Sequence, residues 1–186
     1  PISSLMAWME LLPDYGVDSD TVAEMNKDVN RLSMIASRFS KIGSKPQMAT
    51  DDLNNIVEGA TGYMYTRISR RIRLSSSLAD CALPVMACRP LLEWVLENLI
   101  KNAVDAMEAD GSIAVSTGNG GLAAWIEVRD SGKGISRKNF KKVFSPGFTT
   151  KKRGWGLGLT LAKRIVEQYH QGRIYVKNSV PGQGTT

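Results

Sequence analysis

The sequence Glu97-Asn98-Leu99-Ile100-Lys101-Asn102-Ala103-Val104-Asp105-Ala106-Met107 determines how the rest of the chain is interpreted. It predicts an amphipathic helix, because apolar residues recur at intervals of three and four: Leu96, Leu99, Ile100, Ala103 and Met107. Asn98 and Asn102 lie one turn apart, so both amides can face the same side of the helix. Amide oxygens at this spacing suit Mg²⁺, although two solvated asparagines would give the same pattern.

Two glycine-rich motifs follow this helix. Asp130-Ser131-Gly132-Lys133-Gly134-Ile135 comes after an apolar strand, and Gly154-Trp155-Gly156-Leu157-Gly158-Leu159 opens a further helix. Glycines permit close backbone approach to a ligand, and the N–H groups at a helix start suit phosphate. Each motif alone is weak, since the first also fits an Asx-type turn and many glycine-rich loops bind nothing. The second motif matches neither a Rossmann fingerprint nor a P-loop.

Taken in this order, the motifs resemble the ATP-binding domain shared by sensor histidine kinases, gyrase, Hsp90 and MutL. The resemblance implies ATP and Mg²⁺ as ligands, with Asp130 accepting a hydrogen bond from the adenine amine, and with Asn102 and Asn98 binding the metal. The loop between Phe144 and Gly154 corresponds to a lid over the nucleotide. The ATP-binding residues implied are Asn98, Asn102, Asp105, Asp130, Gly132, Gly134, Ile135, Phe144, Phe148, Thr149, Thr150, Lys151, Gly154, Gly156, Leu157, Gly158, Leu159 and Thr185.

The chain departs from the family pattern at three positions. Hydrolysing members carry a glutamate base where Asn98 stands, and an amide cannot deprotonate water. This favours transfer of the γ-phosphoryl group to a nucleophile brought from elsewhere. Gly147 stands where the family more often has phenylalanine, and Asp105 where many kinases have lysine. Lys101 and Lys151 are the two candidates to compensate for the missing lysine.

The first part of the chain predicts an antiparallel helical hairpin broken at Pro13–Gly16. Apolar residues form two seams: Ile2, Leu5, Met9 and Leu12, then Val22, Met25, Val29, Leu32, Ala36 and Phe39. We expect this stripe to pack against a second copy, making a dimeric four-helix bundle, although it could also pack on its own chain.

The hairpin resembles the dimerisation and phosphotransfer domain of histidine kinases, whose first helix carries His-Glu-x-x-Thr-Pro. Pro1 matches the proline of that motif, which places the phosphoacceptor histidine five residues before Pro1, outside this sequence. His170 lacks the neighbouring motif residues and is expected to be a helix-terminal histidine.

Strands and helices alternate after residue 46, which predicts an α+β protein. The expected domains are a partial hairpin at 1–45 and, at 46–186, an α/β two-layer sandwich with a mixed sheet and one helical layer. Its last strand is expected to be missing. The remaining expected elements are helices at 53–68, 91–107, 137–143 and 157–169, strands at 71–75, 112–116, 124–129 and 173–176, and a hairpin turn at 118–121.

Composition places the chain among ordinary globular proteins. The net charge of +6 comes from separate clusters without interleaved aromatics, which disfavours nucleic acid as a partner. Cys81 and Cys88 are expected to be free thiols, and no apolar run would span a bilayer. These features fit a cytoplasmic segment of a parent protein that could be anchored in the inner membrane.

The combined prediction is the catalytic core of a two-component sensor histidine kinase. It would bind Mg·ATP, form a homodimer through the hairpin and pass the phosphoryl group to a response-regulator aspartate. Two alternatives stay open: a serine kinase of the anti-sigma type, and a nucleotide-binding interaction module without kinase activity.

Overall fold

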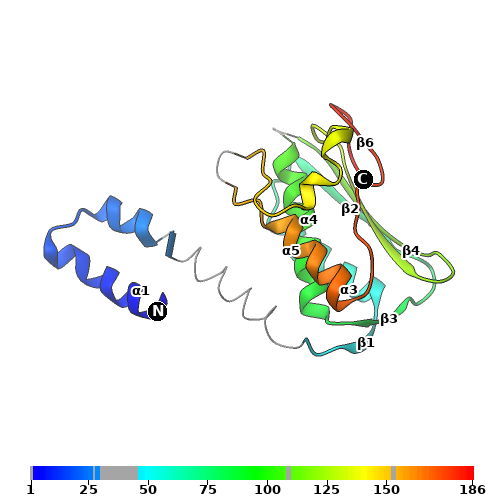
Figure 1. The fold of residues 1–186 in the computed structure, drawn as a ribbon, viewed down its shortest axis with the longest axis horizontal. Coiled ribbons are helices and arrows are strands. Elements are labelled where there is room, and N and C mark those ends of the chain that lie inside the picture. Colours follow the sequence, from blue (N-terminus) through cyan, green and yellow to red (C-terminus); the bar gives the residue numbers. More distant parts are fainter. Residues whose placement is uncertain (1, 27, 30–45, 108–109, 152–153) are drawn as a thin grey trace. The chain divides into compact units, whose positions relative to one another are not determined.

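The computed structural model describes residues 2–26, 28–29, 46–107, 110–151 and 154–186 (Figure 1). The chain divides into two compact units, Pro1–Pro46 and Gln47–Thr186.

The first unit contains two helical segments. Helix α1 spans Ile2–Leu11 and continues into a 3₁₀ turn, η1, at Leu12–Tyr15. Gly16 then adopts a left-handed conformation with φ of 80°, which ends the turn. Residues 19–26 and 28–29 are helical, and the Asp18 carboxylate caps this segment by accepting a 2.8 Å hydrogen bond from the Thr21 backbone N–H.

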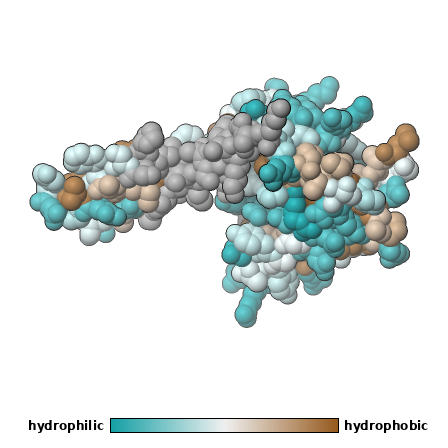
Figure 2. Space-filling model, turned by 90° about the horizontal axis from the view of Figure 1, so that it is seen from below, coloured by the Kyte–Doolittle hydropathy of each residue, from teal (hydrophilic) through white to brown (hydrophobic). Residues whose placement is uncertain are grey.

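The predicted apolar seams of this unit are partly exposed. Met9 and Val29 are buried, whereas Leu5 and Met25 are 47% and 42% exposed. Figure 2 shows apolar surface among hydrophilic residues in this unit. Leu32, Ala36 and Phe39 lie outside the described residues.

The second unit is built on a mixed five-stranded sheet in the order β2-β4-β5-β7-β6. The strands are β2 (Ile72–Ser77), β4 (Gly111–Asn119), β5 (Ala124–Asp130), β6 (Ser179–Val180) and β7 (Gly184–Thr185). Strand β2 runs parallel to β4, and the other neighbours are antiparallel. The predicted mixed sheet is therefore confirmed.

Three helices form a layer against this sheet (Figure 1): α3 (Leu53–Tyr65), α4 (Arg89–Ala106) and α5 (Gly158–Arg164). A π-helical turn, η4 (Ile165–Tyr169), continues α5. The core lies between the layers, and its largest fully buried side chains include Ile56, Leu96, Ile100, Ile113 and Val115. Of the apolar face predicted for the Asn98 helix, Leu96, Ile100, Ala103 and Met107 belong to this core, whereas Leu99 is only half-buried.

Local signals account for where α3 and α4 begin. The Asp52 carboxylate caps α3 by accepting a 3.0 Å hydrogen bond from the Asn54 backbone N–H. Pro90 lies in the first turn of α4, where its missing N–H costs nothing. Both helices are confirmed, although α3 ends at Tyr65, before the predicted end.

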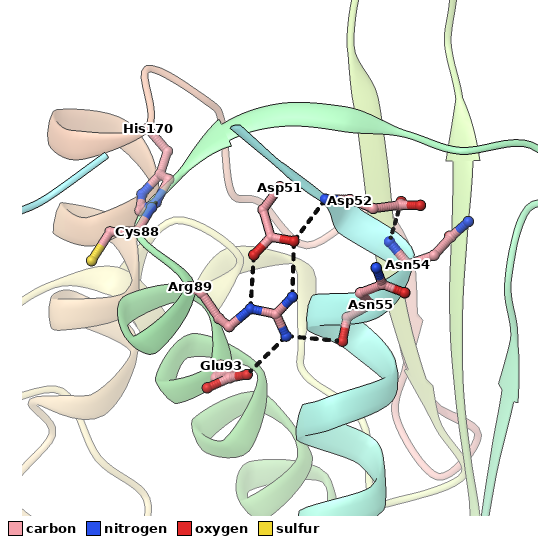
Figure 3. A network of polar contacts seen from close by, with 8 residues as sticks. All are labelled: Asp51, Asp52, Asn54, Asn55, Cys88, Arg89, Glu93 and His170. Carbon is pink, nitrogen blue, oxygen red and sulfur yellow. Dashed lines mark hydrogen bonds and ion pairs between the residues drawn. The ribbon is translucent and has the colours of Figure 1, made fainter. Parts of the chain in front are cut away.

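A small sheet, missed from the sequence, precedes α4. Strand β1 (Ala49–Asp52) pairs antiparallel with β3 (Pro84–Ala87). Arg89 at the start of α4 reaches back to β1 and forms a bidentate pair with Asp51, with N···O distances of 2.7 and 2.8 Å (Figure 3). This pair fixes β1 to the first turn of α4.

Three predicted elements differ in the structure. Residues 173–176 form no strand, because the strand pairing at this edge involves β6 and β7 instead. The predicted helix at 137–143 is two 3₁₀ turns, η2 (Arg137–Asn139) and η3 (Lys142–Phe144). The hairpin turn begins later than predicted, since Gly118 lies within β4 opposite Trp125.

Cys81 and Cys88 are free thiols, as predicted. Among the described residues, we find no helix with the length and apolar character needed to cross a membrane.

Candidate functional site

Asn98 lies half-buried on α4, against the start of α5. A Cβ atom on Gly158, the first residue of α5, would stand 2.4 Å from Asn98 Oδ1, so a larger residue there would require the Asn98 amide to shift. Within the described part of the chain, the buried Nδ2 of Asn98 has no hydrogen-bond partner. Because an unsatisfied buried donor costs free energy, this amide is suited to bind a ligand.

Asn102 lies one turn further along α4 and contacts a cation. The Lys151 ammonium nitrogen is 2.8 Å from Asn102 Oδ1 and 2.6 Å from Asp105 Oδ2. Of the two lysines considered as compensation at position 105, Lys151 is therefore the one that pairs with Asp105. Because the Asn102 oxygen accepts a hydrogen bond from the ammonium cation in this geometry, it fits a metal-binding role.

Asp130 ends strand β5, where it pairs with Ile113 on one side and Thr185 on the other. Its Oδ1 accepts a 2.8 Å hydrogen bond from the Gly132 backbone N–H. Burial raises the pKa of Asp130, an effect that the backbone N–H groups of Gly132 and Thr185 partly oppose. Asp130 is thus a half-buried carboxyl group whose proton affinity is higher than that of an ordinary aspartate.

Gly132 brings this carboxyl group close to the end of α4. A Cβ on Gly132 would lie 2.7 Å from Ala106 Cβ, and Lys133 donates a 3.0 Å backbone hydrogen bond to Ala106 O. Gly134 has a φ of 70°, and a Cβ there would lie 2.2 Å from Val180 O. The two glycines of this motif therefore allow backbone packing that no other residue would tolerate.

Ser179 joins the neighbouring predicted residues and was missed from the sequence. Its Oγ accepts a 2.7 Å hydrogen bond from the Ile135 N–H, donates at 2.8 Å to Gly184 O, and lies 3.0 Å from Thr185 Oγ1. A single serine at the start of a two-residue strand gives no pattern that would have revealed this role.

The lid loop begins with a tight turn that explains Gly147. The Phe148 N–H donates a 3.2 Å hydrogen bond to Ser145 O across Pro146 and Gly147. Gly147 has a φ of 76°, as the third position of a type II turn requires. Its N–H also bonds to Gly156 O at 3.2 Å, so the glycine ties the two ends of the lid together.

The rest of the lid is more open to solvent. Thr149 Oγ1 accepts a 3.1 Å hydrogen bond from the Lys151 N–H, and a Cβ on Gly154 would lie 2.6 Å from Thr149 Oγ1. Thr149 and Thr150 are exposed, whereas Phe144, Phe148, Leu157 and Leu159 are half-buried. Lys152 and Arg153 lie outside the described residues.

The structure thus brings the predicted residues into three contacting groups. Asn98 contacts Gly158, Asn102 and Asp105 share Lys151, and Asp130 bonds to Gly132. The lid phenylalanines, Thr150 and Leu159 are placed by the loop and by the start of α5.

His170 is tied into the fold by both ring nitrogens. Figure 3 shows His170 beside Cys88, and His170 Nε2 accepts a 3.0 Å hydrogen bond from the Cys88 N–H. Nδ1 lies 2.9 Å from Ile165 O, to which it donates. These contacts fix η4 to the start of α4, so His170 is a helix-terminal residue, as predicted. Among the described residues, no group of three or more His, Cys, Asp or Glu side chains could hold a metal ion.

Comparison with known proteins defines the class of the second unit. The catalytic domain of the histidine kinase ThkA superposes with a TM-score of 0.67 and 29% identity, covering 75% of this chain and 91% of the ThkA domain. The sequence model described as histidine kinase-, DNA gyrase B- and HSP90-like ATPase matches residues 88–186. The second unit therefore contains an ATP-binding catalytic domain of the histidine kinase type. The chain belongs to the family of histidine kinase-, DNA gyrase B- and HSP90-like ATPases.

Relatives extend the similarity to the first unit. The sensor histidine kinase ZraS of Escherichia coli K12 is 33% identical over 193 residues, which cover 100% of this chain and 41% of ZraS. This chain thus spans less than half of the length of that kinase. A structure of ThkA in complex with the response regulator TrrA shares the fold, with a TM-score of 0.70 and 22% identity over 99% of this chain and 54% of that one.

Proposed function

We propose that this chain is the catalytic core of a two-component sensor histidine kinase. It binds Mg·ATP, transfers the γ-phosphoryl group to a histidine of a dimerisation helix, and passes it on to an aspartate of a response regulator. The histidine kinase family of the second unit and the full-chain similarity to ZraS support this proposal.

Each end of the nucleotide has a candidate group in the site. The Asp130 carboxylate accepts from the exocyclic amine of adenine, a donor that guanine lacks at that position. The N–H groups around Gly156 and Gly158 face the phosphates, together with the Lys151 ammonium. Asn102 and Asn98 hold the metal ion, which neutralises phosphate charge when it is bound.

One observation carries the assignment to phosphoryl transfer rather than hydrolysis. The residue that contacts the start of α5 is Asn98, whose amide cannot accept a proton from water. Glu97 points about 100° away around the helix and is a poor substitute. The site therefore acts by positioning the nucleotide and stabilising charge, and the nucleophile comes from a separate histidine.

We further propose that residues 1–45 belong to a dimerisation hairpin and residues 46–186 to the catalytic domain. Leu5, Leu11 and Met25 are 47%, 45% and 42% exposed in the chain by itself, which leaves apolar surface for a second copy. The complex of ThkA with TrrA supports a response-regulator receiver domain as the other partner.

The test adds the phosphoacceptor to this chain. An N-terminal helical extension carrying His-Glu-x-x-Thr-Pro, with its proline at Pro1, is incubated with Mg²⁺ and [γ-³²P]ATP. We expect acid-labile label on the added histidine, and none when that histidine is replaced by glutamine. Acid-stable label on serine would support the serine kinase instead. Nucleotide binding by calorimetry without any label on the protein would support the nucleotide-binding interaction module instead.

A further inference from the structure

The last turn of α4 carries the wrong charge for its place in the helix. Helix C-termini favour cations, yet the last turn of α4 has no basic residue and contains Asp105. The missing positive charge is supplied from the lid, because Lys151 forms an ion pair with Asp105 at 2.6 Å. The contact with Lys151, which is distant in the sequence, thus overrides the charge preference of the helix end. Exceptions of this kind are expected at functional sites.

The same ammonium group also covers the candidate metal ligand. Asn102 and Asp105 are three residues apart on α4, so their side chains lie on one side of the helix. The Lys151 Nζ bonds to both, at 2.8 Å from Asn102 Oδ1. An ammonium nitrogen and a metal ion cannot occupy the same position beside this oxygen. Lys151 and a metal ion at Asn102 therefore compete.

We propose that Asp105 is a positioning residue that holds Lys151 on Asn102 and so fastens the lid to α4 until a metal ion takes the Asn102 oxygen. In this arrangement the lid is ordered by the ion pair. When Asn102 binds the metal ion, Lys151 is released from α4 and its charge becomes available to the nucleotide phosphates. The competition step rests on the proposed function, whereas the fastening of the lid does not.

Competition of this kind is reciprocal. If Lys151 on Asn102 weakens metal binding, then metal binding must weaken the Lys151 contact by the same factor. Ion pairs as exposed as this one, with side chains 39% and 36% accessible, are modest in strength. The expected effects are accordingly about two- to five-fold.

The first experiment measures lid order without nucleotide. NMR hydrogen exchange follows two lid amides, Gly147 N–H and Lys151 N–H, in the wild type, Asp105→Asn, Lys151→Met and the double variant. We expect each single variant to accelerate exchange about two- to five-fold, and the double variant no more than Lys151→Met, because that change already removes the ion pair with Asp105. Unchanged exchange in the single variants, or additive effects in the double variant, would overturn the proposal.

Glu167→Gln provides the matched control. Glu167 also forms an exposed ion pair with a lysine, at 3.9 Å from Lys163 on α5, so the change removes the same charge away from the lid. We expect lid exchange to stay at the wild-type rate. An equal acceleration in this variant would show a general charge effect and refute a specific role for Asp105.

The second experiment tests the competition. In saturating Mg·ADP, confirmed by calorimetry, the wild type and Asp105→Asn should reach the same lid exchange rates, because Lys151 has left Asp105 in both. If the two proteins still differ by the factor seen without nucleotide, the competition is wrong. Failure of calorimetry to detect Mg·ADP binding would instead contradict the proposed function, so the two failures are distinguishable.

Discussion

At the scale of single residues, Asp130 is a half-buried carboxyl group with a proposed role in binding adenine. The carboxyl group is held by the Gly132 N–H at 2.8 Å and ends strand β5. Replacement by asparagine keeps the size and the turn but removes the negative acceptor. Losing a hydrogen bond to a charged group costs roughly 1.5–3 kcal/mol. We expect Asp130→Asn to weaken Mg·ADP binding about tenfold or more in calorimetry.

The fold should survive this substitution, as an unchanged circular dichroism spectrum would show. Binding within experimental error of the wild type would mean that Asp130 only stabilises the turn.

The pH dependence of binding follows from the same group. Burial raises the pKa of Asp130, so the carboxyl group takes up its proton at a higher pH than an ordinary aspartate. Nucleotide affinity through this group is complete above the folded-state pKa and is lost as the pH falls through it. The contribution of Asp130 to the free energy of unfolding instead rises as the pH falls, because the folded state binds the proton more tightly than the unfolded state does.

The measurement compares wild type with Asp130→Asn, since the nucleotide phosphates titrate equally for both. The ratio of the two affinities should shrink towards one as the pH is lowered through the acidic range. A ratio that stays constant over that range would show that the charge of Asp130 does not contribute to binding.

At the scale of elements, the start of α5 is set by its contact with α4. A Cβ on Gly158 would lie 2.4 Å from Asn98 Oδ1, so Gly158→Ala requires the Asn98 amide or the start of α5 to shift. We expect weaker nucleotide binding and a loss of stability of about 1–3 kcal/mol, as for other overpacked sites. Chemical denaturation and calorimetry measure the two effects.

Gly62→Ala is the matched control for this prediction. Gly62 lies inside α3, and an added Cβ there would meet nothing within 4 Å. Because alanine is the better helix former, stability should rise by up to about 1 kcal/mol while nucleotide binding stays unchanged. A similar loss of stability in both variants would indicate that the loss does not depend on the Asn98 contact.

Elements with local signals were predicted well, and elements that depend on distant partners were not. Asp52 and Pro90 each lie within two residues of the start of the helix that they indicate, and the apolar periodicity of α4 is visible in its own sequence. Strands β1 and β3 are short and pair over a long separation in the sequence, so nothing local marks them. Conversely, residues 173–176 alternate like a strand but pair with no strand in the described part of the chain.

The same division applies to the candidate site. The glycine motifs indicated Asp130 and the lid, because glycines mark close approaches in the sequence itself, whereas helical spacing indicated Asn98 and Asn102. The sequence left open whether Lys101 or Lys151 replaces the missing lysine at position 105, and the pair that Lys151 forms with Asp105 depends on the folded geometry. The catalytic roles of these residues stay predictions until nucleotide binding is measured.

At the scale of the whole chain, a single histidine tests the direction of phosphoryl transfer. His170 is the only histidine, and both of its ring nitrogens are hydrogen-bonded. We expect the chain without an added phosphoacceptor to bind Mg·ATP but to remain unlabelled after incubation with [γ-³²P]ATP. Acid-labile label that disappears in His170→Gln would contradict the helix-terminal role of this residue.

Assembly is the other property of the whole chain that its surface predicts. Met9 and Val29 are buried within one copy, whereas Leu5 and Met25 are about half exposed on the same seams. If a second copy covers the seams, then charged residues at the exposed positions disturb the dimer and spare the hairpin. We expect the double variant Leu5→Asp/Met25→Asp to be monomeric in light scattering, because burying uncompensated charge costs several kcal/mol.

Tyr15→Asp is the control for the dimer, because Tyr15 is 78% exposed and belongs to neither seam. This variant should keep the oligomeric state of the wild type, and all three proteins should bind Mg·ADP equally, since the catalytic unit is unchanged. A wild type that stays monomeric at high concentration is compatible with a hairpin that dimerises only when longer. Extending the first helix at its N-terminus then decides the matter: a dimer should form, and a persistent monomer would show that the seams do not join two copies.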